Sequence, residues 1–161
     1  MSQTHLHLLI THLPIFGSVL GGLVLAHGLW TRSSQTKIAA YNLLILSAIG
    51  AVIAYMTGEA AEETIENIQG VATNMIEEHE ESALVALVSL IALGVAALGG
   101  LFLTLKKSAI TRTAAIVIFC LALVSFGLVA RTGYLGGQIR HTEIGAGGNA
   151  IHGNEAEEDE D

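Results

Sequence analysis

Histidine is the residue type in this sequence best suited to chemistry, because a neutral imidazole nitrogen can bind haem iron or a divalent metal ion. The chain has seven histidines and one cysteine. His27 and His152 lie apart from the others, near a basic loop and in the C-terminal segment. The remaining five flank long apolar stretches, and the topology derived from loop charges places them at one end of the molecule: His5, His7, His12, His79 and His141.

A b-type haem is the cofactor that such a cluster suits best. It needs one or two axial histidines, an apolar slot between helices and cations beside its propionates. Ligands from facing helices meet more easily than His7 and His12, whose five-residue spacing points them about 140° apart on one helix. We therefore predict His12 and His79 as axial ligands, with His141 as the alternate ligand.

Charged residues on the same side support either haem or a metal ion. Arg131 and Arg140 are the only cations on that side, so they are the predicted propionate partners. A divalent metal is the alternative cofactor, and it needs three or four histidine or carboxylate ligands. The predicted ligands for that alternative are His7, His12, His79, Glu59 and Glu80.

Three functions are compatible with these residues. The first is a haem protein that passes electrons to a redox partner, and the second is a metal-binding or transport accessory protein. The third is a non-catalytic scaffold subunit of a membrane complex. The sequence shows no nucleophile–base pair and no phosphate loop, which favours an electron-transfer or accessory subunit over an enzyme. The net charge of −8 comes from acids on one side, so nucleic acid is not an expected partner.

Four uncharged apolar stretches must position these residues: Leu13–Trp30, Ile38–Gly58, Ala83–Leu105 and Ala114–Ala130. A membrane-spanning helix needs ~20 apolar residues, with a range of about 17–25, and all four stretches fall within it. Lipid leaves no partner for free backbone groups, so each stretch is expected to be helical. A composition of 52% hydrophobic and 14% charged residues agrees. The predicted fold is an all-α bundle of four transmembrane helices over residues 1–144, followed by a disordered acidic tail, 145–161.

Loop charges predict the direction of insertion. Five of the seven basic residues lie between the first and second stretches or between the third and fourth, and no acid lies there. Short cytoplasmic loops collect lysine and arginine, so both basic loops are expected in the cytoplasm. Both termini and the histidine cluster are then expected on the periplasmic side.

Three further patterns predict local structure. The acidic segment Glu59–Gln69 has Ile65 and Ile68 at helical spacing, which predicts a short amphipathic helix at the outer surface. Pro14 predicts either a helix that begins near Thr11 or an earlier helix that kinks there. Small residues recur at four-residue spacing, including Gly17 with Gly21 and Ser47 with Ala51. They predict close helix packing, either inside one chain, which we favour, or across a homodimer face.

Two segments resemble the motifs of a bacterial family of four-helix membrane proteins of unknown function. The entry motif of that family is similar to His7-Leu8-Leu9-Ile10-Thr11-His12-Leu13-Pro14-Ile15, with Leu8 where the family usually has proline. The closing motif is similar to Gly136-Gly137-Gln138-Ile139-Arg140-His141. The resemblance implies the four-span fold, a bacterial inner-membrane location and motif roles for His7, His12, Gly136 and Gly137. The leucine at position 8 predicts an earlier start of the first helix.

Overall fold

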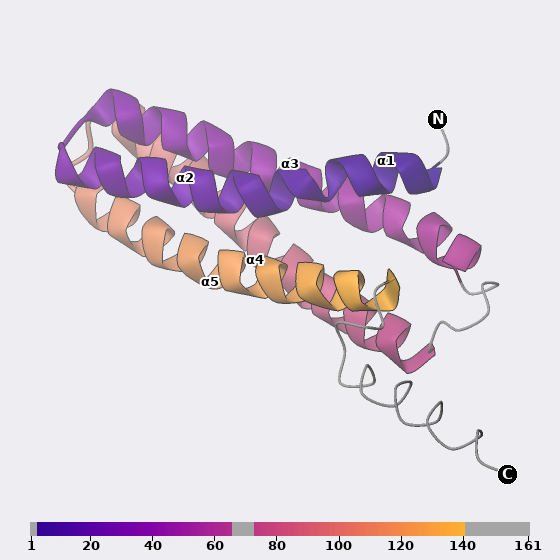
Figure 1. The fold of residues 1–161 in the computed structure, drawn as a ribbon. Coiled ribbons are helices and arrows are strands. Elements are labelled where there is room, and N and C mark those ends of the chain that lie inside the picture. Colours follow the sequence, from indigo (N-terminus) through magenta and orange to yellow (C-terminus); the bar gives the residue numbers. More distant parts are fainter. Residues whose placement is uncertain (1–2, 66–72, 141–161) are drawn as a thin grey trace, which may run out of the picture.

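The protein is all-α, as seen in a computed structural model that describes residues 3–65 and 73–140 (Figure 1). Its helices are α1 (Gln3–Ile10), α2 (His12–Trp30), α3 (Ser34–Ile65), α4 (Thr73–Leu105) and α5 (Thr111–Arg140). Four helical segments are long and apolar enough to cross a membrane: His5–Trp30, Ser34–Gly58, Met75–Leu105 and Thr111–Gln138. The predicted bundle of four transmembrane helices is therefore confirmed. The predicted acidic tail, 145–161, lies outside the described residues.

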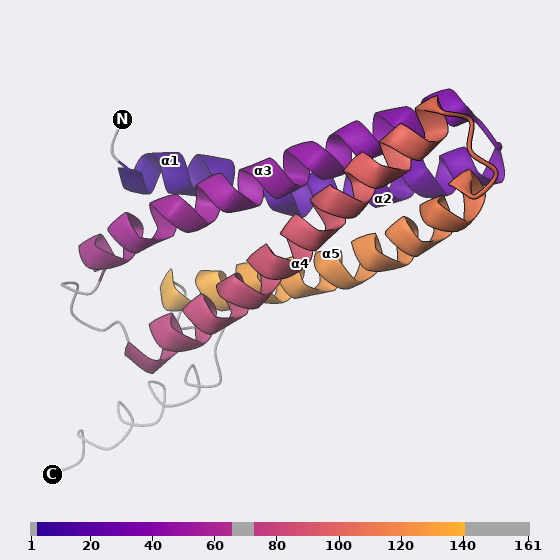
Figure 2. The ribbon, with the colours of Figure 1, turned by 180° about the vertical axis from the view of Figure 1, so that it is seen from behind.

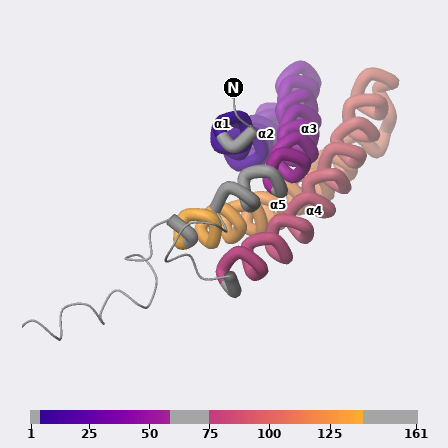
Figure 3. The backbone as a smooth tube through the Cα atoms, turned by 90° about the vertical axis from the view of Figure 1, so that its right-hand side faces the viewer, coloured from indigo at the N-terminus to yellow at the C-terminus, as the bar shows by residue number. Residues whose placement is uncertain are grey.

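The bundle consists of two helical hairpins packed side by side. Helices α2, α3, α4 and α5 contact one another in sequence order, and α2 also contacts α5, so the four form a closed ring. Both short connections, residues 31–33 and 106–110, lie at one end, which we call the loop end (Figures 1 and 2). The opposite end, which carries His7 and His79, is the histidine end. There the pair α1 and α3 diverges from the pair α4 and α5 (Figures 2 and 3).

The first transmembrane segment begins earlier than its apolar stretch and is interrupted once. Helix α1 starts at Gln3, as the leucine at position 8 predicted. Proline has no N–H to donate, so Pro14 leaves the carbonyl of Ile10 without its helical partner, and Thr11 separates α1 from α2. The Thr11 amide still bonds to the carbonyl of His7 at 3.0 Å, so the chain continues in nearly the same direction (Figure 1). This extension carries His7 alongside α3.

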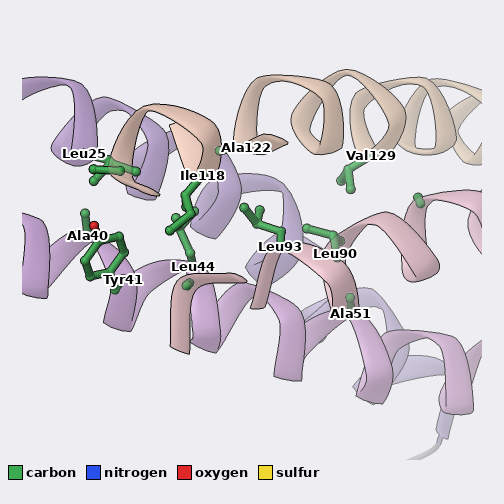
Figure 4. Packing of buried hydrophobic residues seen from close by; sticks show 13 residues of the cluster. Leu25, Ala40, Tyr41, Leu44, Ala51, Leu90, Leu93, Ile118, Ala122 and Val129 are labelled. Atoms are coloured by element: carbon green, nitrogen blue, oxygen red, sulfur yellow. The ribbon is translucent and has the colours of Figure 1, made fainter. Parts of the chain in front are cut away.

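The core of the bundle is small and apolar, and its outer surface is apolar as well. Leu25, Tyr41, Leu44 and Leu93 are fully buried at the centre (Figure 4). Large apolar side chains are also exposed on every long helix: Phe16, Leu23, Leu46, Val95, Phe102, Val117 and Val124. Such a surface would be unfavourable in water and is the one that hydrocarbon chains solvate. The lipid bilayer is therefore the environment that this exterior fits.

Small residues bring the helices together inside the chain. A Cβ at Gly17 would lie 2.8 Å from the Cβ of Ser47, so α2 and α3 are nearly in backbone contact there. Gly21 similarly faces Leu44, and Gly100 faces Tyr41. The four-residue spacing therefore serves packing within one chain at these positions.

The predicted amphipathic helix between the second and third transmembrane helices is not supported. Residues 59–65 continue α3 without a break, because the segment after Gly58 is rich in alanine and glutamate, which are strong helix formers. Gly58 itself is helical and does not end the helix. The remainder of the predicted amphipathic segment, residues 66–69, lies outside the described residues.

Candidate histidine site

His7 is held against α3 by hydrogen bonds to that helix. Its Nδ1 lies 2.9 Å from the carbonyl oxygen of Ala54 and 3.2 Å from Oγ1 of Thr57. The Thr57 hydroxyl also lies 2.9 Å from the carbonyl of Ile53, its acceptor within the helix. A carbonyl oxygen only accepts, so Nδ1 of His7 carries the hydrogen. In the neutral ring, Nε2 is then left with a free lone pair.

His79 is held in the same way against α5. Its Nδ1 donates to the carbonyl oxygen of Thr132 at 3.1 Å. The Thr132 hydroxyl lies 2.8 Å from Oγ of Ser82, which is buried one turn below His79 on α4. The carbonyl again assigns the hydrogen to Nδ1 and leaves Nε2 of His79 as the free nitrogen. His79 precedes the uncharged stretch that begins at Ala83, so it stands about one turn outside the most apolar part of the bundle.

Each imidazole packs on a glycine four residues after the carbonyl that it binds. A Cβ at Gly58 would lie 3.4 Å from Cε1 of His7, and one at Gly136 would lie 3.0 Å from Cε1 of His79. The carbonyls belong to Ala54 and Thr132, one helical turn before these glycines. The two hairpins therefore build the same unit: a histidine on the first helix, and a carbonyl acceptor and a glycine on the second.

The two units lie at the same end of the bundle. His7 and His79 are close enough for a charge on one ring to act on the other, and Glu80 also acts electrostatically on His79. Within the described part of the chain, no protein group bonds to Nε2 of either ring. Two imidazoles, one from each hairpin, thus have Nδ1 bonded to a main-chain carbonyl and Nε2 without a described partner at the same end of the bundle.

His12, the other predicted axial ligand, points elsewhere. Its Nδ1 donates to the carbonyl of Leu8 at 3.0 Å, on its own segment of chain. Its ring is exposed and lies parallel to Phe16, with 6.3 Å between ring centroids. The structure therefore brings His79 together with His7 and leaves His12 on the outer surface. His5 is also exposed on α1.

The remaining predicted site residues are only partly described. Arg131 forms an ion pair with Glu78, with Nη2 and Oε1 3.4 Å apart and both side chains more than half exposed. Arg140 closes α5 and Glu59 lies within α3, but their side chains are outside the described set, and His141 is outside it altogether. Among the side chains that are described, no three of histidine, cysteine, aspartate and glutamate gather into a group that could hold a metal ion.

Several parts of this site were not predicted from the sequence. The sequence could not identify the carbonyls of Ala54 and Thr132 as hydrogen-bond acceptors for the histidines, because every residue has a carbonyl. The signal available was a glycine on the second helix of each hairpin: Gly136 was named as a motif position, whereas Gly58 was taken as the end of the second apolar stretch. Ser82 and Thr57 carry no signal that separates them from other hydroxyl residues of the helices.

No family model, curated protein sequence or solved structure matches this chain. The resemblance to a four-helix membrane family of unknown function stays a prediction.

Proposed function

We propose that the protein binds b-type haem at the histidine end, with His7 and His79 as axial ligands, and serves electron transfer. The observation that carries this proposal is the shared orientation of the two rings, each with Nδ1–H bonded to a main-chain carbonyl. Histidines that bind metals almost always donate their other ring N–H to a carbonyl or carboxylate, which orients the ring and makes Nε2 more basic. Two such nitrogens from facing helices are the donor set that a b-type haem takes in a helical bundle.

The residues around the two rings fit such a group. Gly58 and Gly136 keep space beside each imidazole free of side-chain atoms. Arg131 lies on α5 one residue from Thr132, and its exposed pairing with Glu78 is weak enough to be exchanged for a propionate. Arg140, nine residues further along α5, is the second proposed propionate partner. A bound haem supplies one-electron chemistry, and the chain supplies ligands, orientation and partial burial.

The proposal places the histidine end in the periplasm of a bacterial inner membrane. Five of the seven basic residues lie in the two short connections of the loop end or in the helix turns beside them. Basic loops remain in the cytoplasm during insertion, so both termini would be periplasmic. A periplasmic redox partner or membrane complex would then exchange electrons at the exposed edge of the site.

A visible spectrum of the purified protein tests the proposal. Expression with sufficient haem should yield a Soret band and a sharp α band on reduction. His79→Ala or His7→Ala should abolish or strongly shift these bands, because each removes one axial nitrogen. His12→Ala and His27→Ala are matched controls, since both histidines are exposed and outside the pair, and they should leave the spectrum unchanged. Absence of a Soret band in the wild type, or its persistence in the His7→Ala/His79→Ala double variant, would exclude this site.

A divalent metal is the second candidate for the same pair, because Glu80 acts electrostatically on His79; the described side chains do not complete a set of three ligands, so a further ligand would have to join them. Glu59 is the other proposed carboxylate. Metal analysis of the purified protein distinguishes the two cofactors. Bound zinc or another divalent ion that is lost in His79→Ala and in Glu80→Gln, without a haem spectrum, would favour this candidate.

A further inference from the structure

Two residues at the loop end adopt a backbone conformation that favours glycine. Arg32 follows α2 with φ of 55°, and Lys107 follows α4 with φ of 52°; among the described residues these are the only positive φ values outside glycine. Both positions end a helix, where glycine is the usual residue because a side chain is strained there. The chain uses 18 glycines elsewhere, yet it has a basic residue at both of these positions. Strain retained at equivalent positions points to a role for the side chains.

The helix end at Lys107 is otherwise well formed. At the end of α4, the Ser108 amide donates to the carbonyl of Leu103 at 3.0 Å and the Lys107 amide donates to that of Thr104 at 3.1 Å. This pattern is the common helix ending in which the left-handed residue is usually glycine. The hydrogen bonds of the backbone would therefore be satisfied with glycine at position 107, and the lysine is not required by the turn.

The loop end carries positive charge without any compensating acid. Its cations are Arg32, Lys37, Lys106, Lys107 and Arg112. No aspartate or glutamate occurs in residues 1–58 or 82–142, so none belongs to either loop or to the helix ends beside it. The one ion pair between described residues, Arg131 with Glu78, lies at the histidine end. Lys37 is buried, whereas the other four cations are exposed and are thus available to an external anion.

The same end also carries exposed apolar side chains. Trp30 is 84% exposed just before Arg32, and Ile110 is 58% exposed between Lys107 and Arg112. The Lys106 ammonium lies 5.7 Å from the centre of the Phe102 ring, which places this charge where the apolar surface of α4 ends. Tryptophan and lysine at the end of a transmembrane helix mark the level of the lipid headgroups. We therefore expect the exposed basic residues to stand at the depth of the membrane's phosphate groups.

We propose that the loop end is a binding surface for anionic phospholipid headgroups, with Arg32 and Lys107 as its two matched phosphate contacts. The two loops lie side by side because α2 contacts α5 and α3 contacts α4 (Figures 1 and 2). One cation is thus supplied by each hairpin. A lipid is the ligand that this surface fits, because the exposed apolar side chains of Trp30 and Ile110 lie next to the basic residues. A lipid would contact both kinds of side chain, whereas a soluble phosphate would contact only the charged ones. The proposal is independent of the haem site and of which leaflet the loop end enters.

The single tryptophan, Trp30, makes this surface directly observable. Purified protein in vesicles of brominated phosphatidylcholine should show quenched tryptophan fluorescence, and unlabelled lipids added to the vesicles should relieve it. Phosphatidylglycerol should compete several-fold more effectively than phosphatidylcholine, and high salt should reduce this preference. The double variant Arg32→Gly/Lys107→Gly removes both charges and relieves the backbone strain, so it should fold at least as well and lose most of the preference for phosphatidylglycerol.

Control variants test whether the lipid preference depends on charge at the loop end in particular. Arg131→Gln removes a cation at the histidine end and should keep the preference for phosphatidylglycerol. Arg112→Gln, an exposed residue in the first turn of α5, provides a second loop-end variant with an expected partial loss. Inorganic phosphate added to the buffer should not relieve the quenching or remove the preference. Equal competition by both lipids in the wild type, an unchanged preference in the double variant, or full displacement by inorganic phosphate would overturn the proposal.

Discussion

His7 and His79 are oriented by main-chain carbonyls rather than by charged side chains. Each carbonyl belongs to the backbone of a helix, so its position is set by the helix as a whole. Most substitutions of Ala54 or Thr132 would therefore leave the carbonyl in place. The glycines Gly58 and Gly136 are different, because there the absence of a side chain leaves space for the ring. The sequence identified His79 as a candidate ligand from its place before an apolar stretch. It paired His79 with His12, because spacing along one helix says nothing about which face meets the opposite hairpin.

The adjacent glycines of α5 provide a test of the ring position. A Cβ at Gly136 would lie 3.0 Å from Cε1 of His79, whereas a Cβ at Gly137 would have no neighbour within 4 Å. Alanine in place of glycine stabilises a helix interior by up to about 1 kcal/mol. We expect Gly137→Ala to raise the thermal midpoint in detergent and Gly136→Ala to lose that gain or lower the midpoint. An equal increase in both variants would show that the His79 ring is not confined by Gly136.

Where a helix begins or ends is set by a few local residues. Which residues of two helices contact each other depends on the side that each helix turns toward its neighbour. Pro14 allowed either a helix that begins near Thr11 or an earlier helix that kinks there, because its missing N–H is a property of one residue, and the structure has the second arrangement. The continuation of α3 to Ile65 was missed, since a periodic acidic segment after Gly58 looks the same whether it lies on a membrane or projects from it. Close packing was predicted from small residues, and the structure assigns the partners: Gly17 lies against Ser47, and Gly21 against Leu44.

The α2–α3 contact predicts unequal effects of two glycine substitutions in the same helix. A Cβ at Gly17 would lie 2.8 Å from the Cβ and 3.1 Å from the Cα of Ser47, so the two backbones would have to separate. A Cβ at Gly22 would make an ordinary contact, 3.8 Å from the Cβ of Ala122. Overpacking typically costs about 1–3 kcal/mol, so Gly17→Ala should lower the thermal midpoint and Gly22→Ala should leave it equal or higher. Matching midpoints for the two variants would contradict this packing.

A hydroxyl pair joins α4 to α5 inside the membrane. The Oγ atoms of Ser89 and Ser125 are 2.7 Å apart, and Ser125 is fully buried. Double-mutant cycles on such bonds in membrane bundles give coupling energies of about 0.6 kcal/mol. We expect a coupling of that order from Ser89→Ala, Ser125→Ala and their combination, measured by reversible unfolding in detergent. Strictly additive effects would show that the two hydroxyls do not share a bond.

At the scale of the molecule, the two hairpins place all described acids at the histidine end and the cations of both loops at the opposite end. This separation of charge is a property of the sequence combined with the ring of helices, in which consecutive helices run in opposite directions. It leads to the proposal that the loop end faces the cytoplasm.

Cysteine labelling tests this orientation. In a Cys120→Ser background, Ser34→Cys and Ala109→Cys place a thiol beside each loop, and Glu77→Cys places one at the histidine end; all three positions are exposed. In intact cells with a permeable outer envelope, a membrane-impermeant maleimide should label only position 77. Inverted membrane vesicles should show labelling of positions 34 and 109 and protection of position 77. Labelling of positions 34 and 109 from opposite sides would be incompatible with the ring of four helices.

The sequence by itself determined the four spans, because these depend on the length and apolar character of each segment. It also determined which end carries the loop cations and which end carries most of the histidines, because these follow from their positions between the spans. The tertiary structure alone decided that the ring of His7 lies near His79, whereas the ring of His12 is exposed on the outer surface. That outcome depends on contacts between positions 47 and 53 residues apart, His7 with Ala54 and His79 with Thr132. The rotation of each helix against its neighbour sets these contacts, and it arises from the packing of small residues between helices, which no single helix encodes.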